Sequence, residues 1–422
     1  MDTPHDLWGQ YSPFFSVPSD IDPSTPPECD LTFGQVLSRH GSRDPTWRKT
    51  NAYDALIYRI QNSVSEYAPG YEFIADYDFP LGKDQLTLFG QREMVESGKA
   101  FYQRYKNLAD DSDPFFRAAG ASRVIESAYN FTHGLLEAQG RSDEIHLPKD
   151  MLILPEVRGF NNTLNHGGCP EFESRSFSEI KHEIQDTWKR VWLPPVTERL
   201  NRKLPGSKIT LDETIYMMDL CPFHTVASPD AVTSDFCRLF SKKEWRNYAY
   251  FESLDKWYGY GMGNPLGPTQ GVGFANELIA RLTGTPVQDE TSTNSTLDSS
   301  KDTFPLNRTL YADFSHDNLM TSVFAALGLY NATNGLSPTH EESPEQNNGY
   351  SAAWTVPFAG RMYVEKMRCS SDDEELVRVL VNDRVVPLHN CGADNLGRCR
   401  LGAFVESLSF ARNGGLWDAC FT

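Results

Sequence analysis

An apolar run that opens directly into a cationic loop is the feature that most constrains the fold of this chain. The run 31–37 has the composition of a buried strand. The loop that follows it reads, in order, Arg39, His40, Gly41, Ser42, Arg43, Asp44 and Pro45. Paired guanidinium donors can hold phosphate oxygens, and an imidazole between them can act as a nucleophile. The segment therefore predicts a central strand with a phosphate site at its carboxyl end.

Side chains suited to the same chemistry accompany two other predicted strands. Arg117 belongs to the strand-like stretch 114–120, and His316 and Asp317 follow the apolar stretch 310–314. In open α/β sheets, ligands bind outside the carboxyl ends of the strands. We therefore expect the three sets of residues to meet at one edge of a sheet.

These residues predict a division of labour in phosphoryl transfer. His40 is the expected nucleophile, because neighbouring cations lower its pKa and keep the ring neutral in acid. Asp317 is the expected proton donor to the leaving alkoxide, since a nearby phosphate anion raises the pKa of a carboxyl group. The guanidiniums are expected to neutralise the negative charge on the phosphate oxygens, so neither a metal ion nor another cofactor is expected. The predicted phosphate-binding residues are Arg39, Arg43, Arg117 and His316.

Hydrophobic periodicity predicts an α/β fold with a helical insert. Strands alternate with helices at both ends of the chain, and the stretch 376–388 predicts a hairpin that turns at Asn382 and Asp383. Between about 122 and 250 the periodicity is helical and strand signals are weak. We predict a large α/β domain, 1–121 and 251–422, with a central mixed sheet flanked by helices. The smaller all-α domain is 122–250 and covers the active-site cleft.

Charge and hydropathy exclude several classes of partner. The formal net charge is −18, which argues against a nucleic acid held on a broad basic face. The sequence contains no apolar run of 18 residues, so no membrane span is expected. An anionic substrate then requires local concentration of Arg in one cleft.

Eight cysteines and several N-x-S/T sequences indicate a secretory history. The even count fits disulfides, in any of 105 pairings, and the absence of a CxxC pair argues against a zinc site. The candidate glycosylation sites are Asn130, Asn161, Asn294, Asn307 and Asn331. We expect a secreted protein, although residues 1–4 do not begin a signal peptide.

The chain resembles the histidine acid phosphatases and, within them, the fungal phytases. The motif of 39–45 and the pair His316-Asp317 are typical of the superfamily, whereas the segments 7–15, 258–261, 263–268 and 383–388 are similar to the fungal branch. The resemblance implies a cleft between two domains, a secreted monomer active in acid, and stepwise removal of phosphate from inositol hexakisphosphate. It also implies the disulfides Cys29–Cys369, Cys169–Cys420, Cys221–Cys237 and Cys391–Cys399.

Three further cations are candidates for contacts with the outer phosphates of such a substrate, namely Arg48, Lys49 and Lys256. An alternative on the same scaffold is an acid phosphatase of broad specificity, or one for a specialised metabolite phosphate. A phosphate-binding protein without activity is disfavoured because nucleophile, anion clamp and acid are all present. A phosphomutase is disfavoured by the cysteines and the glycosylation sequences.

Overall fold

The strands of the described part of the chain form one mixed sheet, as predicted. The computed structural model describes residues 5–112, 114–141, 151–370 and 372–422, so the start of the chain, 1–4, on which the expectation about a signal peptide rests, lies outside the described residues. Within the described residues the strands are β1 (Cys29–Arg39), β2 (Phe115–Ala119), β3 (Leu152–Leu154), β4 (Leu310–Ser315), β5 (Arg361–Cys369), β6 (Leu376–Val381), β7 (Arg384–Val386) and β8 (Cys399–Arg400). Their order is β3-β2-β4-β1-β5-β6-β7, and β8 pairs with β6.

The parallel half of the sheet explains why the site lies where it does. Strands β3, β2, β4 and β1 run in the same direction, whereas β5 is antiparallel to β1. Arg39 pairs with Ser315 at the ends of β1 and β4, and Ala119 pairs with Leu154 at the ends of β2 and β3. The segments that follow these four strands therefore emerge at one edge, where ligands bind in open α/β sheets.

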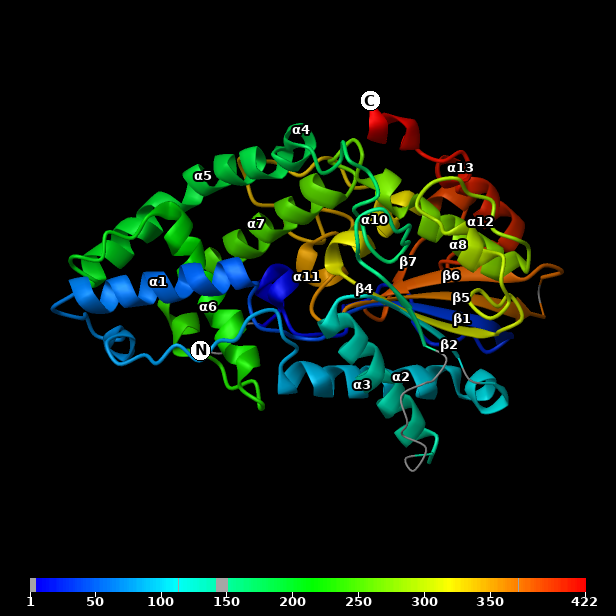
Figure 1. Ribbon diagram of the computed structural model, residues 1–422, viewed down its shortest axis with the longest axis horizontal. Coiled ribbons are helices and arrows are strands. Elements are labelled where there is room, and N and C mark those ends of the chain that lie inside the picture. The colour runs from blue at the N-terminus through cyan, green and yellow to red at the C-terminus, as the bar shows by residue number, and fades with distance from the viewer. Residues whose placement is uncertain (1–4, 113, 142–150, 371) are drawn as a thin grey trace.

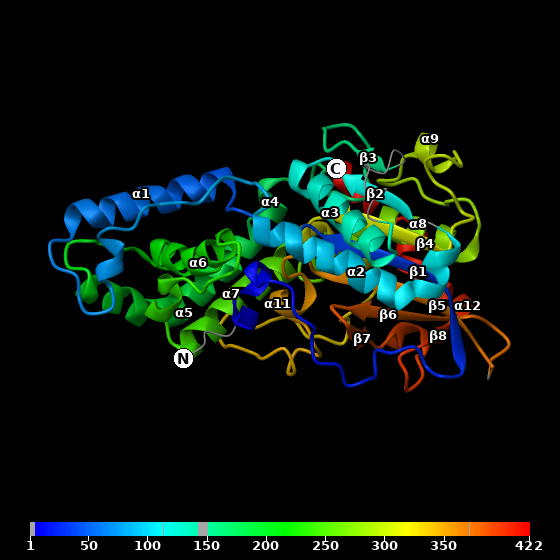
Figure 2. The ribbon, with the colours of Figure 1, turned by 90° about the horizontal axis from the view of Figure 1, so that it is seen from below.

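Helices cover both faces of the sheet and form a separate group beside it. The helices are α1 (Trp47–Ser63), α2 (Leu88–Asp111), α3 (Ser122–Ala138), α4 (Arg175–Ser178), α5 (Ile180–Lys203), α6 (Leu211–Ala227), α7 (Lys242–Tyr260), α8 (Val272–Thr283), α9 (Ser295–Asp298), α10 (Asp317–Ala326), α11 (Ala352–Thr355), α12 (Leu401–Ser407) and α13 (Ser409–Arg412). Figure 1 shows α2 and α3 below the sheet, and α8, α10 and α12 above it. A second group of helices lies beside the sheet, at the left of Figure 1, and consists of α1, α5, α6 and α7. The view from below shows the same separation (Figure 2).

The boundaries predicted for the helical domain, 122 and 250, remain a prediction, but the contacts assign three elements differently. Helix α3 packs against α2, β2 and β4, and β3 is itself part of the sheet, although both lie within 122–250. Helix α1, which precedes 122, packs against α6. Periodicity identifies an amphipathic helix but does not identify the surface that the helix covers.

The hairpin and the disulfides of the structure match the expectations. Asn382 and Asp383 form the turn between β6 and β7, with φ angles of 49° and 68°, the left-handed geometry that such turns require. The four disulfides join the pairs implied by the resemblance, namely Cys29–Cys369, Cys169–Cys420, Cys221–Cys237 and Cys391–Cys399.

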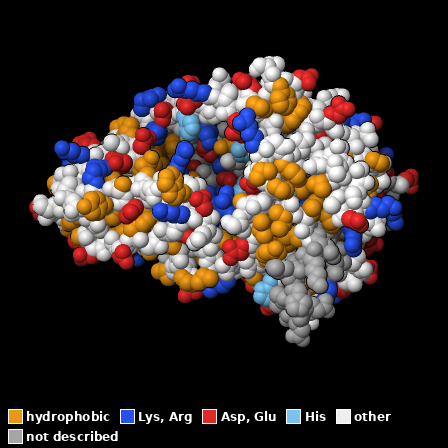
Figure 3. Space-filling view, viewed as in Figure 1, with side chains coloured by type: hydrophobic (Ala, Val, Ile, Leu, Met, Phe, Trp, Pro, Cys, Tyr) orange, Lys and Arg blue, Asp and Glu red, His pale blue; other side chains and the backbone are white. Residues whose placement is uncertain are grey.

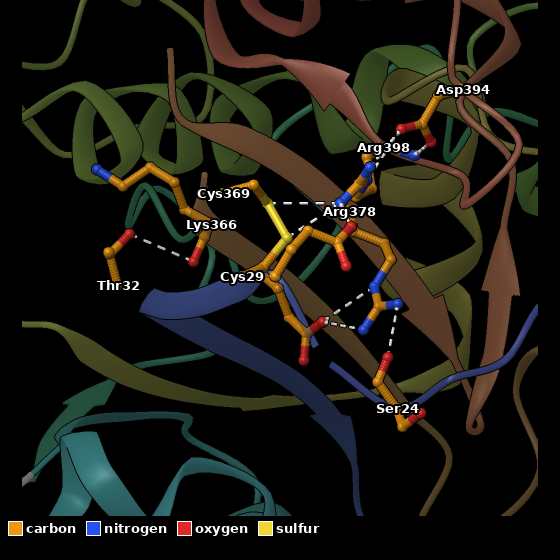
Figure 4. Close-up of a disulfide and its surroundings, with 10 residues drawn as sticks. Ser24, Cys29, Thr32, Lys366, Cys369, Arg378, Asp394 and Arg398 are labelled. Atoms are coloured by element: carbon orange, nitrogen blue, oxygen red, sulfur yellow. Dashed lines mark hydrogen bonds and ion pairs between the residues drawn. A yellow bond between two sulfur atoms is a disulfide. The ribbon is translucent and has the colours of Figure 1, made fainter. Parts of the chain in front are cut away.

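One disulfide fastens the edge of the sheet opposite to the site. Cys29 and Cys369 are partners in the β1–β5 ladder, so the bond joins the first residue of β1 to the last residue of β5 (Figure 4). The Nη1 atom of Arg398 lies 3.0 Å from the sulfur of Cys29, and its guanidinium also pairs with Asp394. Nearby, Arg378 pairs with Glu365 of β5.

The described residues also bear on the expectations about membrane spans and glycosylation sequences. None of their helices has the length and apolar character needed to span a bilayer. Three candidate glycosylation residues, Asn161, Asn307 and Asn331, are exposed, whereas Asn130 and Asn294 are partly buried. Glycosylation itself remains a prediction at all five.

Candidate active site

A cleft of about 560 Å³ lies at the carboxyl edge of the parallel strands, and helices α5, α6 and α7 contribute its other wall. Its Lys and Arg residues are Arg43, Lys49, Arg123, Lys181, Lys189 and Lys256. In Figure 3 the viewed face is hollowed between the two parts of the molecule, and Lys, Arg and His side chains gather around the hollow. The cleft thus gathers six cations although the net charge of the chain is −18, but only two of them are arginines. Six Asp and Glu residues line the same cleft.

The imidazole of His40 is held in the tautomer that a nucleophile needs. Its Nδ1 atom lies 2.9 Å from the carbonyl oxygen of Gly41. A carbonyl only accepts, so Nδ1 carries the proton and Nε2 keeps its lone pair. Burial, and then the charges of Arg39 and Arg123, hold the pKa of His40 well below 6.5. The neutral ring therefore persists to lower pH than in an exposed histidine, as predicted from the sequence.

The loop that carries His40 is fixed by its neighbours. The amide of Gly41 donates to the Ser127 hydroxyl at 3.1 Å, and the amide of Ser42 donates to the Glu93 carboxylate at 2.8 Å. A Cβ atom at Gly41 would lie 2.4 Å from the carbonyl oxygen of Gly90, so glycine permits the close approach to α2.

Three guanidiniums near His40 carry hydrogen-bond donors without acceptors. The Nε atoms of Arg39, Arg43 and Arg123 are buried, and none has a hydrogen-bond partner among the described residues. Leaving a buried donor unpaired is costly, so these atoms favour a bound oxyanion. Arg43 and Arg123 line the cleft. The sequence analysis did not identify Arg123, although its position in the first turn after β2 resembles that of Asp317 after β4.

Arg39 is fully buried and does not line the cleft. Its Nη1 atom donates to the carbonyl oxygens of Val356, at 2.8 Å, and Gln10, and its guanidinium lies 4.5 Å from the ring centre of Phe358. Burial lowers the pKa of Arg39 to about 10, so the group stays charged in acid. Its Nη2 atom lies 3.3 Å from the carboxylate of Asp317. Arg39 therefore contacts Asp317 from a buried position behind the cleft lining.

His316 lies beside His40 and between two charged groups. The two imidazole rings are 5.7 Å apart between centroids. The Nε2 atom of His316 is 2.9 Å from Glu156 Oε1, and Nδ1 is 3.4 Å from Arg123 Nη2. A carboxylate accepts and a guanidinium donates, so Nε2 carries the proton and Nδ1 is the acceptor.

Asp317 begins α10 and faces two cations. Its Oδ2 atom lies 3.3 Å from Arg39 Nη2 and 2.8 Å from Lys256 Nζ. Burial alone would raise the pKa of Asp317, but Arg39 and then Lys256 outweigh burial and hold the pKa well below 3.8. The predicted rise in the pKa of Asp317 depends on a bound phosphate and stays a prediction, whereas the protein's own charges lower this pKa. A phosphate anion bound among the same cations would act in the opposite direction.

Arg117, predicted to bind phosphate, does not reach the cleft. Its Nε atom donates to Asp313 at 2.8 Å and its Nη2 atom to Glu277 at 2.6 Å, and all three side chains are buried. Arg281 completes this group by pairing with Asp313 at 2.6 Å. The position of Arg117 within β2, rather than after it, directs its guanidinium to partners on β4 and α8. The prediction for Arg117 is corrected, and Arg123 is the residue at the cleft.

We expect Arg117→Met to lower the free energy of unfolding by about 3–5 kcal/mol, because it leaves the buried carboxylate of Glu277 without its ionic partner. Chemical denaturation measures this change. The matched variant Arg123→Met loses a 4.0 Å ion pair with Asp84 and a 3.4 Å contact with His316 Nδ1, and neither loss leaves a buried carboxylate unpaired. It should keep its stability while losing phosphatase activity. Equal stability of the two variants would contradict the assignment.

The three predicted rim cations differ in position. Lys49 and Lys256 line the cleft, whereas Arg48 is exposed and outside it. Lys49 Nζ lies 2.8 Å from Asp219 Oδ2 and 3.0 Å from the hydroxyl of Tyr11. Lys256 Nζ has three acceptors within 3.1 Å, on Asp317, Asp255 and Asn318.

The sequence analysis missed two more cations in the cleft, Lys181 and Lys189 of α5. Their eight-residue spacing, with Gln185 between them, places all three on one face of the helix, which is a recognisable signal. Lys181 pairs with Asp255, and Lys189 pairs with Asp186 and Asp212. Within the described ranges no three His, Cys, Asp or Glu side chains are arranged to hold a metal ion.

Comparison with known families identifies the class of protein. The family model of the histidine phosphatase superfamily (branch 2) matches residues 30–382, and the chain belongs to this superfamily. Phytase A of Emericella nidulans is 52% identical over 99% of this chain and 90% of that protein. Phytase A of Aspergillus oryzae is 51% identical over 98% of this chain and 90% of that protein.

Solved structures agree with the fold. The crystal structure of the phytase from D. castellii has a TM-score of 0.78 at 20% identity, over 96% of this chain and 85% of that chain. The Bifidobacterium longum multiple inositol polyphosphate phosphatase, in complex with inositol hexasulfate, has a TM-score of 0.63 at 17% identity, over 96% and 97% of the two chains. The mixed α/β architecture is therefore that of known phytase structures.

Proposed function

We propose that this chain is a phytase, a phosphomonoesterase that hydrolyses inositol hexakisphosphate through a phosphohistidine at His40. The observation that carries the proposal is a neutral imidazole with a free Nε2 lone pair, set among buried guanidinium donors that lack acceptors. The curated relatives named Phytase A support the substrate.

The first half-reaction transfers the phosphoryl group to the ring. Nε2 of His40 attacks phosphorus, the ester P–O bond breaks, and the leaving oxygen takes a proton from Asp317 to give the alcohol. In the second half-reaction water attacks phosphorus, the P–N bond breaks, and the carboxylate of Asp317 takes the proton from water. Inorganic phosphate leaves, and both residues return to their starting protonation states.

The anion clamp in this mechanism consists of Arg39, Arg43, Arg123 and His316. Guanidiniums hold the phosphate oxygens by paired, charge-assisted hydrogen bonds and stabilise the charge that shifts among them in the transition state. Arg39 also contacts Asp317, so one buried cation connects the clamp to the acid.

The outer phosphates of the substrate would meet the lysines of the cleft wall, Lys49, Lys181 and Lys189. A second candidate, a phosphatase of broader specificity, is favoured by one observation: each of these lysines is already paired with a carboxylate, on Asp219, Asp255 and Asp212 respectively. Such pairing reduces the positive potential that attracts a polyanion.

A comparison of substrates tests the proposal. We expect kcat/KM for inositol hexakisphosphate to exceed that for a small alkyl monoester across the acid range. A strong preference for the small ester would remove the phytase assignment and leave the phosphatase. Rapid quenching with radiolabelled substrate into alkaline denaturant should trap label on His40, and the absence of label there would contradict the covalent route.

Secretion and glycosylation belong to the same proposal. The four disulfides support an oxidising compartment, because such bonds are rare in reducing ones. The asparagines of three glycosylation sequences are exposed, which favours their modification. A substrate of small-molecule size requires only one copy of the cleft, which is consistent with a monomer.

A further inference from the structure

Glu156 lies at the same sheet edge as the proposed catalytic residues, and the sequence analysis did not single it out. Strand β3 pairs with β2 and ends at Leu154, so the chain enters this edge two residues before Glu156. The Oε1 atom of Glu156 accepts from the Nε2–H of His316 at 2.9 Å and from the Ala121 amide at 3.0 Å. The carboxylate therefore connects the start of α3 to the imidazole of His316.

The contacts of His316 leave only one nitrogen for a substrate. Nε2 already donates to Glu156, and Nδ1 accepts from Arg123 Nη2 at 3.4 Å. A phosphate oxygen that entered between Nδ1 and Arg123 would need donors on both sides. The guanidinium is a permanent donor, but Nδ1 becomes one only when the ring takes a second proton.

We propose that Glu156 is a positioning residue for phosphate binding: it holds the ring of His316 and supplies the countercharge for its imidazolium form. The ring takes its second proton at Nδ1 from solvent when a phosphate oxygen replaces the Arg123 contact. Imidazolium and guanidinium then both donate to that oxygen. This inference rests on the proposed function and adds a residue to its phosphate site.

The titratable and charged groups that face His316 come from four segments. Glu156 follows β3, Arg123 lies on α3, His40 follows β1, and Asp317 is the next residue of α10. Burial lowers the pKa of His316, the hydrogen bond and charge of Glu156 oppose that effect, and Arg123 adds to it. Glu156 is thus the principal group that favours the charged ring.

The variant Glu156→Gln separates charge from geometry. Its amide oxygen can still accept from Nε2–H, so the ring keeps its place while the countercharge is lost. The pKa of His316 should then fall, and affinity for phosphate should decline at lower pH than in the unmodified enzyme. The measurement is competitive inhibition by inorganic phosphate from about pH 3 to about pH 7. Above the pKa of His316, inhibition of Glu156→Gln should be about tenfold weaker than inhibition of the unmodified enzyme, which corresponds to a fall of one pKa unit.

A matched pair in the same cleft provides the control. His166 lines the cleft and its Nδ1 atom lies 2.7 Å from Glu173 Oε1, so Glu173→Gln removes the same charge from another histidine. The pH profile of phosphate inhibition in Glu173→Gln should match that of the unmodified enzyme. Glu156→Asp keeps the charge and should keep the pH profile even if its affinity falls.

Two outcomes would decide against the inference. An unchanged inhibition profile in a folded Glu156→Gln variant would overturn it, as would equal shifts in Glu156→Gln and Glu156→Asp. Titration of the His316 ring by NMR gives a readout that a purely structural role would not move. The proposed function fails separately, if the unmodified enzyme hydrolyses no phosphate monoester while still binding inorganic phosphate.

Discussion

His40→Ala is expected to reduce kcat by at least about 10,000-fold, because removal of a nucleophile eliminates the covalent route. The remaining groups could still bind phosphate, so affinity for inorganic phosphate should survive. The hydrogen bond of the ring is local, from Nδ1 to the adjacent carbonyl of Gly41, and its loss should leave the fold intact. Steady-state kinetics and the thermal midpoint measure the two effects.

A second histidine serves as the control for this variant. His224 lies outside the cleft, and its Nδ1 atom is 2.9 Å from the hydroxyl of Ser234. His224→Ala should therefore keep kcat within a few-fold of the unmodified enzyme. If His40→Ala retained activity comparable with that of His224→Ala, the phosphohistidine mechanism would have to be abandoned.

Asp317→Asn is expected to slow alkyl phosphate esters, including inositol phosphates, by about 100- to 10,000-fold, the range for loss of a general acid. Aryl phosphates with acidic phenols should be slowed far less, because their leaving groups depart without a proton. Asparagine keeps the size of the side chain but removes the negative partner of Arg39 and Lys256. The ratio of kcat values for the two substrate classes is the measurement.

The pH dependence gives an independent check on the same residue. A proton donor acts only when protonated, so activity on alkyl esters should fall as pH rises through the pKa of Asp317 in the enzyme–substrate complex. Arg39 and Lys256 hold the pKa of Asp317 low in the protein without substrate, so we expect the fall at the acid end of the range. Equal slowing of alkyl and aryl esters by Asp317→Asn would show that another group donates the proton.

Much of the site could be predicted because its residues directly follow strands. The apolar stretches that became β1 and β4 end just before His40 and Asp317, and parallel pairing brings these residues to the same edge of the sheet. Arg117 was assigned wrongly because a strand pattern does not specify cross-strand register. Its partner in the ladder is Asp313, and this pairing of opposite charges becomes visible only when β2 and β4 are adjacent.

Other parts of the site depended on tertiary structure. Strand β3 has three residues, Leu152–Leu154, too few for a periodic signal, so the position of Glu156 could not be inferred. Arg123 resembled an ordinary helix residue until the end of β2 placed it in the cleft wall. The cations of α5 had a helical spacing, but nothing in the sequence indicated which surface that face would meet.

The position of β1 in the sheet has a consequence for how the protein matures. Both neighbours of this early strand arrive late: β4 begins at Leu310 and β5 ends at Cys369. During synthesis the strand that precedes His40 must therefore wait for more than half of the chain before it gains either lateral partner. Such distant pairings fold slowly and leave strand edges open to aggregation in the meantime. Ribosome-bound chains that stop before β4 should lack activity, and their yield should depend on chaperones.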